Sequence, residues 1–132
     1  MRALLLLLAG LGFARAVVAT DPPAPVVVTI ADEGKTIELK PGQALQIVLV
    51  ANRTTGFSWS VEKIDTALLS LVGQPVYTTD AKPGVVGVGG TETWNLLAVG
   101  AGEQALKFVY RRSFEPNVPP ARVFSFSVRI RS

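Results

Sequence analysis

Residues 123–130 read Val-Phe-Ser-Phe-Ser-Val-Arg-Ile, and this stretch decides the class of fold. Large apolar residues alternate with small or charged ones at a period of two, which is typical of a β-strand with one buried face. The predicted inward residues are Phe124, Phe126, Val128 and Ile130. The predicted outward residues are Ser125, Ser127 and Arg129. Comparable strand-like runs occur at 26–30, 35–39, 43–51, 57–62, 91–99 and 104–110.

Turn signals separate these runs at intervals of about 8 to 15 residues, and neither a convincing helix nor a repeat competes with them. Residues 68–78 are expected to be extended, with a helical turn at 67–71 as the alternative. The pattern predicts an all-β fold, an immunoglobulin-like β-sandwich of about seven to eight antiparallel strands. Five aromatic residues on the inward phase of their strands are expected in the core: Trp59, Trp94, Phe108, Phe124 and Phe126.

The composition indicates one globular domain that lacks the residues most often used in catalysis. The chain has 132 residues, of which 48% are hydrophobic and 17% are charged. It contains no cysteine and no histidine, which excludes disulfides, thiolate nucleophiles, the common zinc sites and the usual general base at neutral pH. The carboxylates of Glu92, Glu103 and Glu115 show no spacing that suggests acid–base work. We therefore expect a protein that is not an enzyme and needs no metal or other cofactor.

The N-terminal residues have the composition of a secretory signal peptide. Met1-Arg2 precedes an apolar run at 3–13, and mostly small residues follow at 14–19. Arg15 interrupts the run too early for a membrane span, which needs about 20 apolar residues. We predict a signal peptide at 1–19, a Pro-rich linker at 20–25 and an Ig-like domain at 26–132. The mature protein is expected to be periplasmic or secreted and free of the membrane.

The net charge gives no sign of a nucleic-acid partner. The formal charge of the whole chain is +3, but Arg2 and Arg15 belong to the predicted leader. Removing these two from the 13 basic residues leaves 11 against 10 acidic residues, so the mature charge is about +1. Nucleic-acid binding is therefore not expected.

Three connections between the predicted strands have unusual sequences. They are Asn-Arg-Thr-Thr-Gly at 52–56, a segment with four glycines at 81–90, and Arg-Arg-Ser-Phe-Glu-Pro-Asn-Val-Pro-Pro at 111–120. Because successive antiparallel strands alternate in direction, these three connections are expected at the same end of the sandwich, where loops form a composite binding surface. Taken singly, each has a simpler interpretation. The first could be an ordinary hairpin turn, the second a flexible linker without function, and the arginines of the third solvent-exposed residues at the edge of a sheet.

The three connections contain recognisable motifs in a fixed order. Asn-x-Thr-Thr-Gly-Phe is followed closely by Trp, then by Gly-x-Gly-Gly-Thr-Glu at the start of a strand, then by an Arg-x-aromatic loop after a strand ending in Tyr. From about Lys35 to the C-terminus, this order resembles the chagasin-type inhibitors of papain-like cysteine peptidases. Gly87-Val88-Gly89-Gly90 matches the family's middle motif. Arg53 replaces the proline of the usual Asn-Pro-Thr-Thr-Gly, and Arg112-Ser113-Phe114 replaces the usual Arg-Pro-Trp.

The resemblance implies that the three loops dock together on a papain-like cysteine peptidase, the first in the catalytic cleft and the others at its sides. Thr54 and Thr55 would lie over the catalytic Cys-His pair. Gly89 and Gly90 would allow a positive φ or a close backbone approach, and the third loop would supply side anchors. The implied peptidase-binding residues are Asn52, Arg53, Thr54, Thr55, Gly56, Phe57, Gly87, Val88, Gly89, Gly90, Arg112, Ser113 and Phe114. The inhibitor is expected to be a monomer; the alternative function is a non-inhibitory secreted Ig-like module that binds a protein or a glycan.

The residues that differ from the family motifs are expected to change the order and the charge of the loops. A proline at position 53 would fix its own φ and restrict the preceding residue, so Arg53 is expected to leave the first loop less ordered. Arg53 and Arg112 are expected to project from the binding end and to speed association with a peptidase that has an acidic rim. Ser113 is expected to loosen the third loop. Asn52-Arg53-Thr54 also matches the N-glycosylation sequon.

Overall fold

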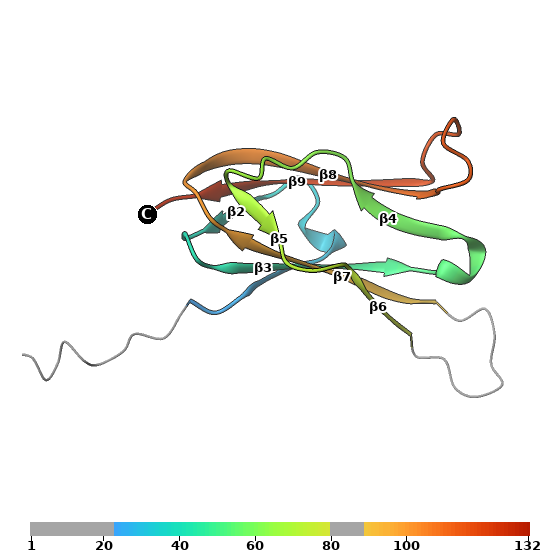
Figure 1. Cartoon of the computed structure of the whole chain (residues 1–132), viewed down its shortest axis with the longest axis horizontal. Coiled ribbons are helices and arrows are strands. Elements are labelled where there is room, and N and C mark those ends of the chain that lie inside the picture. The colour runs from blue at the N-terminus through green and yellow to red at the C-terminus, as the bar shows by residue number, and fades with distance from the viewer. Residues whose placement is uncertain (1–22, 80–88) are drawn as a thin grey trace, which may run out of the picture.

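Two β-sheets pack face to face in this computed structural model, which describes residues 23–79 and 89–132 (Figure 1). The first sheet contains, in order, β1 (Val26–Val28), β3 (Ala44–Ala51), β7 (Gly90–Ala98) and β5 (Leu69–Leu71), and β6 (Val76–Thr79) also pairs with β7. The second contains, in order, β2 (Thr36–Leu39), β9 (Arg122–Ile130), β8 (Gly102–Arg112) and β4 (Phe57–Val61). Short 3₁₀ helices occur at η1 (Ile30–Asp32) and η2 (Arg53–Thr55). This architecture confirms the predicted immunoglobulin-like β-sandwich, with nine strands in the described residues where about seven to eight were predicted.

The strand pairing differs from the prediction in one respect. The sequence pattern predicts antiparallel strands, but β1 runs parallel to β3 and β2 runs parallel to β9. Both strands lie at sheet edges, and the chain crosses between the sheets before and after β2, so neither strand forms a hairpin with its sequence neighbour. The remaining pairs are antiparallel.

The first strand is shorter than the predicted run at 26–30 because a capped turn ends it. β1 stops at Val28, and η1 follows. The hydroxyl of Thr29 accepts the N–H of Ala31 at 3.3 Å, and the carboxylate of Asp32 accepts the N–H of Thr29 at 3.0 Å. The bond from the Thr29 N–H, with a smaller contribution from Lys35, holds the pKa of Asp32 below its ordinary value. Local capping thus overrides the strand propensity of an aliphatic run.

The segment at 68–78 is extended over β5 and β6, and the alternative of a helical turn at 67–71 is wrong because residues 69–71 form β5. The N–H of Leu69 donates to the carbonyl oxygen of Asp65 at 3.0 Å, which closes one turn before β5. The extended prediction is confirmed for β5 and β6, which both pair with β7. A bend that includes Gly73, at φ 71°, separates the two strands.

The core consists of the inward faces of both sheets. The alternation predicted for β9 is confirmed, with Phe124, Phe126, Val128 and Ile130 all buried. The other aromatic residues predicted in the core are also buried: Trp59, Trp94 and Phe108. The rings of Trp94 and Phe108 meet in a T-shaped arrangement with their centroids 5.3 Å apart. Each buried side chain of this size stabilises the fold by about 1.5–3 kcal/mol, so the loops extend from a firmly packed frame.

The described strand ends that flank the three unusual connections lie at the same end of the sandwich, as the strand directions predict (Figure 1). In the first sheet Gly90 of β7 pairs with both Ala51 of β3 and Thr79 of β6. In the second sheet Phe57 of β4 pairs with Arg112 of β8, which places their ends beside the first loop. Gly87 and Val88 lie outside the described residues.

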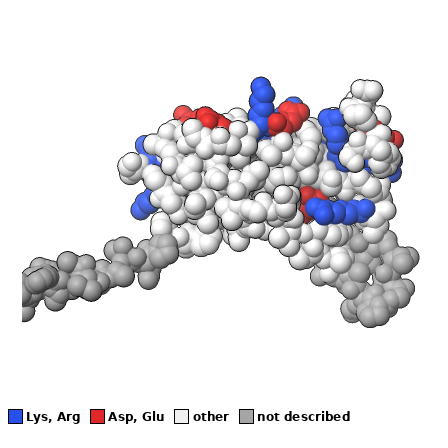
Figure 2. Space-filling model, viewed as in Figure 1, with Lys and Arg blue, Asp and Glu red and all other residues white. Residues whose placement is uncertain are grey.

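Charged side chains are distributed unevenly over the surface. On the second sheet the Arg129 guanidinium contacts Glu103 at 2.7 Å and Glu38 at 3.0 Å. In the view of Figure 2 most of the visible acidic and basic groups lie on the side formed by the second sheet, and fewer lie on the opposite side. Since Glu103 lies near the start of β8 and Arg129 near the end of β9, this ion-pair network is at the opposite end of the sandwich from the three loops.

Candidate functional site

The first loop is a closed turn with its own internal hydrogen bonds. Asn52 caps η2, because its side-chain oxygen accepts the N–H of Thr54 at 3.2 Å and also the Thr54 hydroxyl. The hydroxyl of Thr55 donates to the Asn52 carbonyl oxygen at 2.8 Å. Gly56 ends the turn at φ 87°, a left-handed conformation that glycine adopts without strain. The turn exposes Thr54 and Thr55 at its tip.

Aromatic residues hold the base of this turn. The N–H of Asn52 donates to the Tyr110 hydroxyl at 2.8 Å. The Tyr110 ring, which is buried, stacks on Phe57 with the centroids 5.1 Å apart and lies 4.9 Å from the ring of Trp59. The indole N–H of Trp59 donates to the carbonyl oxygen of Val50 at 2.9 Å. The strands that enter and leave the turn are therefore joined to β8 and to each other.

The side chain of Arg53 is tied back onto the sandwich. Its Nε lies 3.2 Å from Oε2 of Glu92, and its guanidinium lies 4.9 Å from the centre of the Tyr77 ring. The backbone N–H of Arg53 also reaches the Tyr77 hydroxyl, at 3.4 Å. These contacts of Arg53 are not part of the sequence-based prediction, which considers only the missing φ restraint of proline and expects a less ordered loop. The Arg53 side chain is 40% exposed at this end of the sandwich, while its Nε is paired with the buried Glu92.

The third loop is fastened to the first loop. Nε of Arg112 donates to the carbonyl oxygen of Thr55 at 2.9 Å, and the guanidinium lies 4.5 Å from the centre of the Phe57 ring. Phe114 is 69% exposed, yet its ring covers Gly56 so closely that a Cβ at that glycine would lie 3.0 Å from Cε1 of Phe114. Ser113 is exposed beside it. The two loops thus form one continuous surface.

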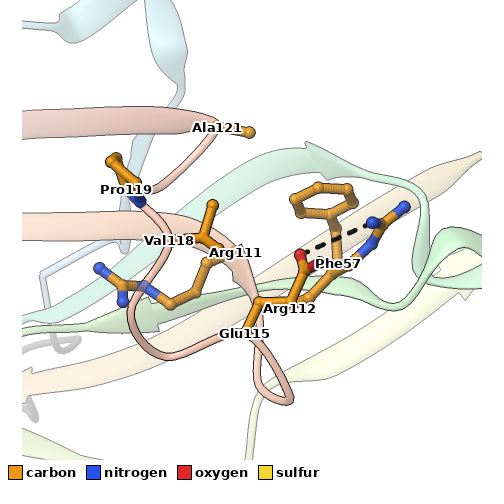
Figure 3. A pocket seen from close by; sticks show the side chains of 7 residues that line it. All are labelled: Phe57, Arg111, Arg112, Glu115, Val118, Pro119 and Ala121. Atoms are coloured by element: carbon orange, nitrogen blue, oxygen red, sulfur yellow. Dashed lines mark ion pairs between the residues drawn. The ribbon is translucent and has the colours of Figure 1, made fainter.

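A hollow of about 260 Å³ lies behind the third loop (Figure 3). Its lining residues are Phe57, Arg111, Arg112, Glu115, Val118, Pro119 and Ala121. Arg112 Nη1 lies 3.6 Å from the Glu115 carboxylate, as the dashed line in Figure 3 shows. Arg111 Nη1 donates to the carbonyl oxygen of Pro116 at 3.1 Å. These two arginines therefore support the loop from within, in addition to the contact of Arg112 with the first loop.

The described part of the second loop corrects one expectation about its glycines. Neither Gly89 nor Gly90 has a positive φ. A Cβ at Gly90 would overlap the carbonyl oxygen of Thr78, so glycine is needed there for the pairing of β6 with β7. A Cβ at Gly89 would meet the Ala51 carbonyl oxygen at 3.5 Å, an ordinary contact. The backbone that approaches Gly90 closely is thus that of Thr78 in the neighbouring strand of the same protein.

Three residues that support the site were not among those predicted for it. They are Tyr77, Glu92 and Tyr110. The sequence contained a signal for Glu92, because it shares the inward phase of its strand with Trp94, and an acidic residue facing a core requires a partner. The partners of the two tyrosines are contributed by a loop distant in sequence. The predicted residues Asn52 to Phe57, Gly89, Gly90 and 112–114 do come together at one end of the molecule.

The described part of the chain lacks two features that would suggest another kind of site. No group of three or more Asp or Glu side chains is placed to hold a metal ion in residues 23–79 and 89–132. Over the same residues no helix is long and apolar enough to cross a membrane.

Comparison with known proteins places this fold and site in a family. Residues 38–128 match the family described as Chagasin family peptidase inhibitor I42. The chain therefore belongs to the chagasin family of peptidase inhibitors. This membership confirms the resemblance found in the sequence and the expectation that the chain is not an enzyme.

Individual relatives support the same assignment. The chain is 32% identical to Amoebiasin-1 of Entamoeba histolytica over 96 residues, which cover 72% of this chain and 89% of the relative. It is 32% identical to Chagasin of Trypanosoma cruzi over 89 residues, 64% of this chain and 79% of the relative. Among solved structures, the cysteine protease inhibitor EhICP2 from Entamoeba histolytica superposes with a TM-score of 0.72 at 28% identity, covering 82% of this chain and 96% of that one.

Proposed function

We propose that this protein is a reversible inhibitor of papain-like cysteine peptidases, which blocks the active-site cleft with the β3–β4, β6–β7 and β8–β9 loops. The observation that carries the proposal is the braced turn at 52–56, which presents Thr54 and Thr55 at the end of the sandwich where the first loop contacts the third. A relative of this family, EhICP2, is a cysteine protease inhibitor.

The geometry of the turn explains how it would enter a cleft without being cleaved. Clefts that bind extended peptides pair with backbone groups in a β conformation. Residues 53–55 instead form a 3₁₀ turn, and the N–H of Gly56 donates to the Arg53 carbonyl oxygen at 3.0 Å. The hydroxyl of Thr55 is also bonded inside the turn. The peptide bonds at the tip are therefore not offered in the extended form that a nucleophile would attack.

The contacts between loops explain how a modest surface would bind tightly. Ordering side chains and loops on docking costs about 0.5–1.5 kcal/mol for each mobile side chain. Arg112 and Phe114 are already packed against the first loop, so much of this ordering precedes binding. Arginine and aromatic residues are also the types that contribute most at interfaces.

Titration against papain tests the proposal. The purified protein is added to papain in stoichiometric steps, and hydrolysis of a fluorogenic peptide is followed. We expect loss of activity at a one-to-one ratio, recovery of activity on dilution, and an inhibitor that remains intact by mass spectrometry. Full papain activity in the presence of micromolar protein, or cleavage of the turn at 52–56, would overturn the proposal.

We also propose that the protein is exported with residues 1–19 as its signal peptide and acts in the periplasm or outside the cell. The support is the charged start and apolar run of those residues. The mass of the exported protein tests this idea, because cleavage after Ala19 leaves Thr20 at the N-terminus. Recovery of uncleaved chain from the cytoplasm alone would count against it.

A further inference from the structure

The Glu92 carboxylate joins the two arms of the first loop. The side chain belongs to β7 of the first sheet and is fully buried. Its Oε2 lies 3.2 Å from Nε of Arg53, which precedes the Thr54–Thr55 tip. The same oxygen accepts the backbone N–H of Trp59 at 3.1 Å, in the strand of the second sheet that follows the tip. One carboxylate therefore bridges the two sheets directly beneath the loop.

Packing of the core does not explain a carboxylate in this position, because burying it costs hydration free energy. Glu92 faces inward on the same strand as Trp94, where an apolar side chain would fill the space without losing hydration. Its charge is compensated by Arg53, and Tyr77 flanks the guanidinium of that arginine. In several proteins a buried polar pair of this kind selects one arrangement of the chain. Here the arrangement selected is that of the turn that carries Thr54 and Thr55.

We propose that Glu92 is a positioning residue for inhibition: through Arg53 it holds the Thr54–Thr55 turn in the conformation that docks. A proline at position 53 would restrict the same turn covalently, by fixing its own φ and limiting Asn52. In this chain an ion pair supplied by another strand takes over that restraint. The inference rests on the proposed function, because positioning matters only if the turn docks on a peptidase.

Association and dissociation rates with papain test the inference in a double-mutant cycle. The variants are Arg53→Ala, Glu92→Gln and the combination of both. Because Glu92 is fully buried, its side chain cannot touch the peptidase, so any effect of Glu92→Gln on affinity must act through the inhibitor itself. We expect each single change to raise Kd about tenfold and the double change to raise it no further than the larger single effect. Independent, multiplying effects would overturn the inference.

An exposed ion pair distant from the loops provides a control for the loss of an ion pair elsewhere in the fold. Arg129 Nε lies 2.7 Å from Oε2 of Glu103 at the far end of the sandwich. We expect Arg129→Ala and Glu103→Gln to leave Kd within about twofold of the wild type, since exposed pairs contribute little and these lie far from the loops. If the control pair alters Kd as strongly as Glu92→Gln does, the effect is one of general stability and the inference fails.

A proline at position 53 can distinguish a role of Glu92 in positioning the turn from a role in the general stability of the fold. We expect Arg53→Pro in the Glu92→Gln background to restore Kd to within about threefold of the wild type, since proline restores the restraint without the ion pair. Failure of this rescue would overturn the inference.

Hydrogen exchange separates failure of this inference from failure of the proposed function. The amide N–H groups of Thr54 and Thr55 should exchange about tenfold faster in Glu92→Gln and at the wild-type rate in Glu103→Gln. If the wild type does not inhibit papain, the proposed function fails, yet exchange at these two amides still shows whether Glu92 holds the turn. Unchanged exchange in Glu92→Gln would overturn the positioning role whatever the inhibition assay gives.

Discussion

Arg112 Nε donates to the carbonyl oxygen of Thr55 at 2.9 Å, so a strand of the second sheet holds the tip of the first loop. The two residues are 57 positions apart in the sequence and meet only because β4 pairs with β8. The bond fixes the position of Thr55 relative to Phe114, which packs over Gly56. The first and third loops are therefore in direct contact, and changes in either should affect binding by both.

Replacing Arg112 should weaken inhibition even when the charge is kept. Lysine lacks the planar guanidinium that bonds to Thr55 while lying over the Phe57 ring, so Arg112→Lys and Arg112→Ala should each raise Ki about tenfold. Arg131→Lys, at the C-terminal end of the second sheet, serves as the control and should leave Ki unchanged. Wild-type inhibition by Arg112→Lys would mean that charge alone matters at this position.

The two described glycines of the second loop should respond differently to alanine. A Cβ at Gly90 overlaps the Thr78 carbonyl oxygen, so Gly90→Ala should lower Tm by about 5 °C or more. Gly89→Ala has room for its Cβ and should leave Tm within about 1 °C of the wild type. Thermal unfolding followed by circular dichroism makes the comparison. Equal Tm values for the two variants would contradict this account of Gly90.

Removing the Tyr110 hydroxyl should cost more stability than removing that of Tyr77. Tyr110 accepts the Asn52 N–H at 2.8 Å beside a buried ring, so Tyr110→Phe should destabilise the fold by about 1 kcal/mol. The Tyr77 hydroxyl accepts the Arg53 N–H at 3.4 Å in an exposed position, and Tyr77→Phe should have less than half that effect. Urea denaturation measures both free energies of unfolding. A larger loss for Tyr77→Phe would show that the second contact is the stronger one.

The rate of association should depend only weakly on salt. Arg53 is paired with Glu92 and Arg112 with Glu115, so neither arginine contributes an uncompensated charge to the loop surface. We expect the association rate with papain to change less than about threefold between roughly 50 and 500 mM NaCl. A decrease of about tenfold or more over this range would restore the idea that these arginines steer the encounter.

The folded protein should be monomeric and insensitive to chelators. Over the residues that the structure describes, no cluster of carboxylates could hold a metal ion, and the core is completed by apolar side chains. We expect one cooperative unfolding transition with the same Tm with and without EDTA, and a monomeric mass in sedimentation at micromolar concentration. A lower Tm in EDTA, or a stable dimer, would contradict this expectation.

The sequence alone predicted most of the strands, the inward face of β9 and the position of the first and third loops at one end. The alternation in β9 places Phe124 and Phe126 in the core because a strand has a period of two whatever its neighbours are. The loops at 52–56 and 113–121 share one end because antiparallel strands alternate in direction. These properties depend on local geometry, which the order of residues determines directly.

Only the tertiary structure decided how the site is held. In the motif, Arg53 replaces a proline, and the φ restraint of that proline is lost. Glu92, on a strand of the first sheet 39 positions later, restrains the turn instead through its contact with Arg53. The motif suggests that Gly90 is a binding residue. In the structure, glycine is required there because a side chain would overlap the carbonyl oxygen of Thr78 on the neighbouring strand. In both cases the deciding contact joins distant segments, and contacts of that kind exist only once the strands have paired and the sheets have packed.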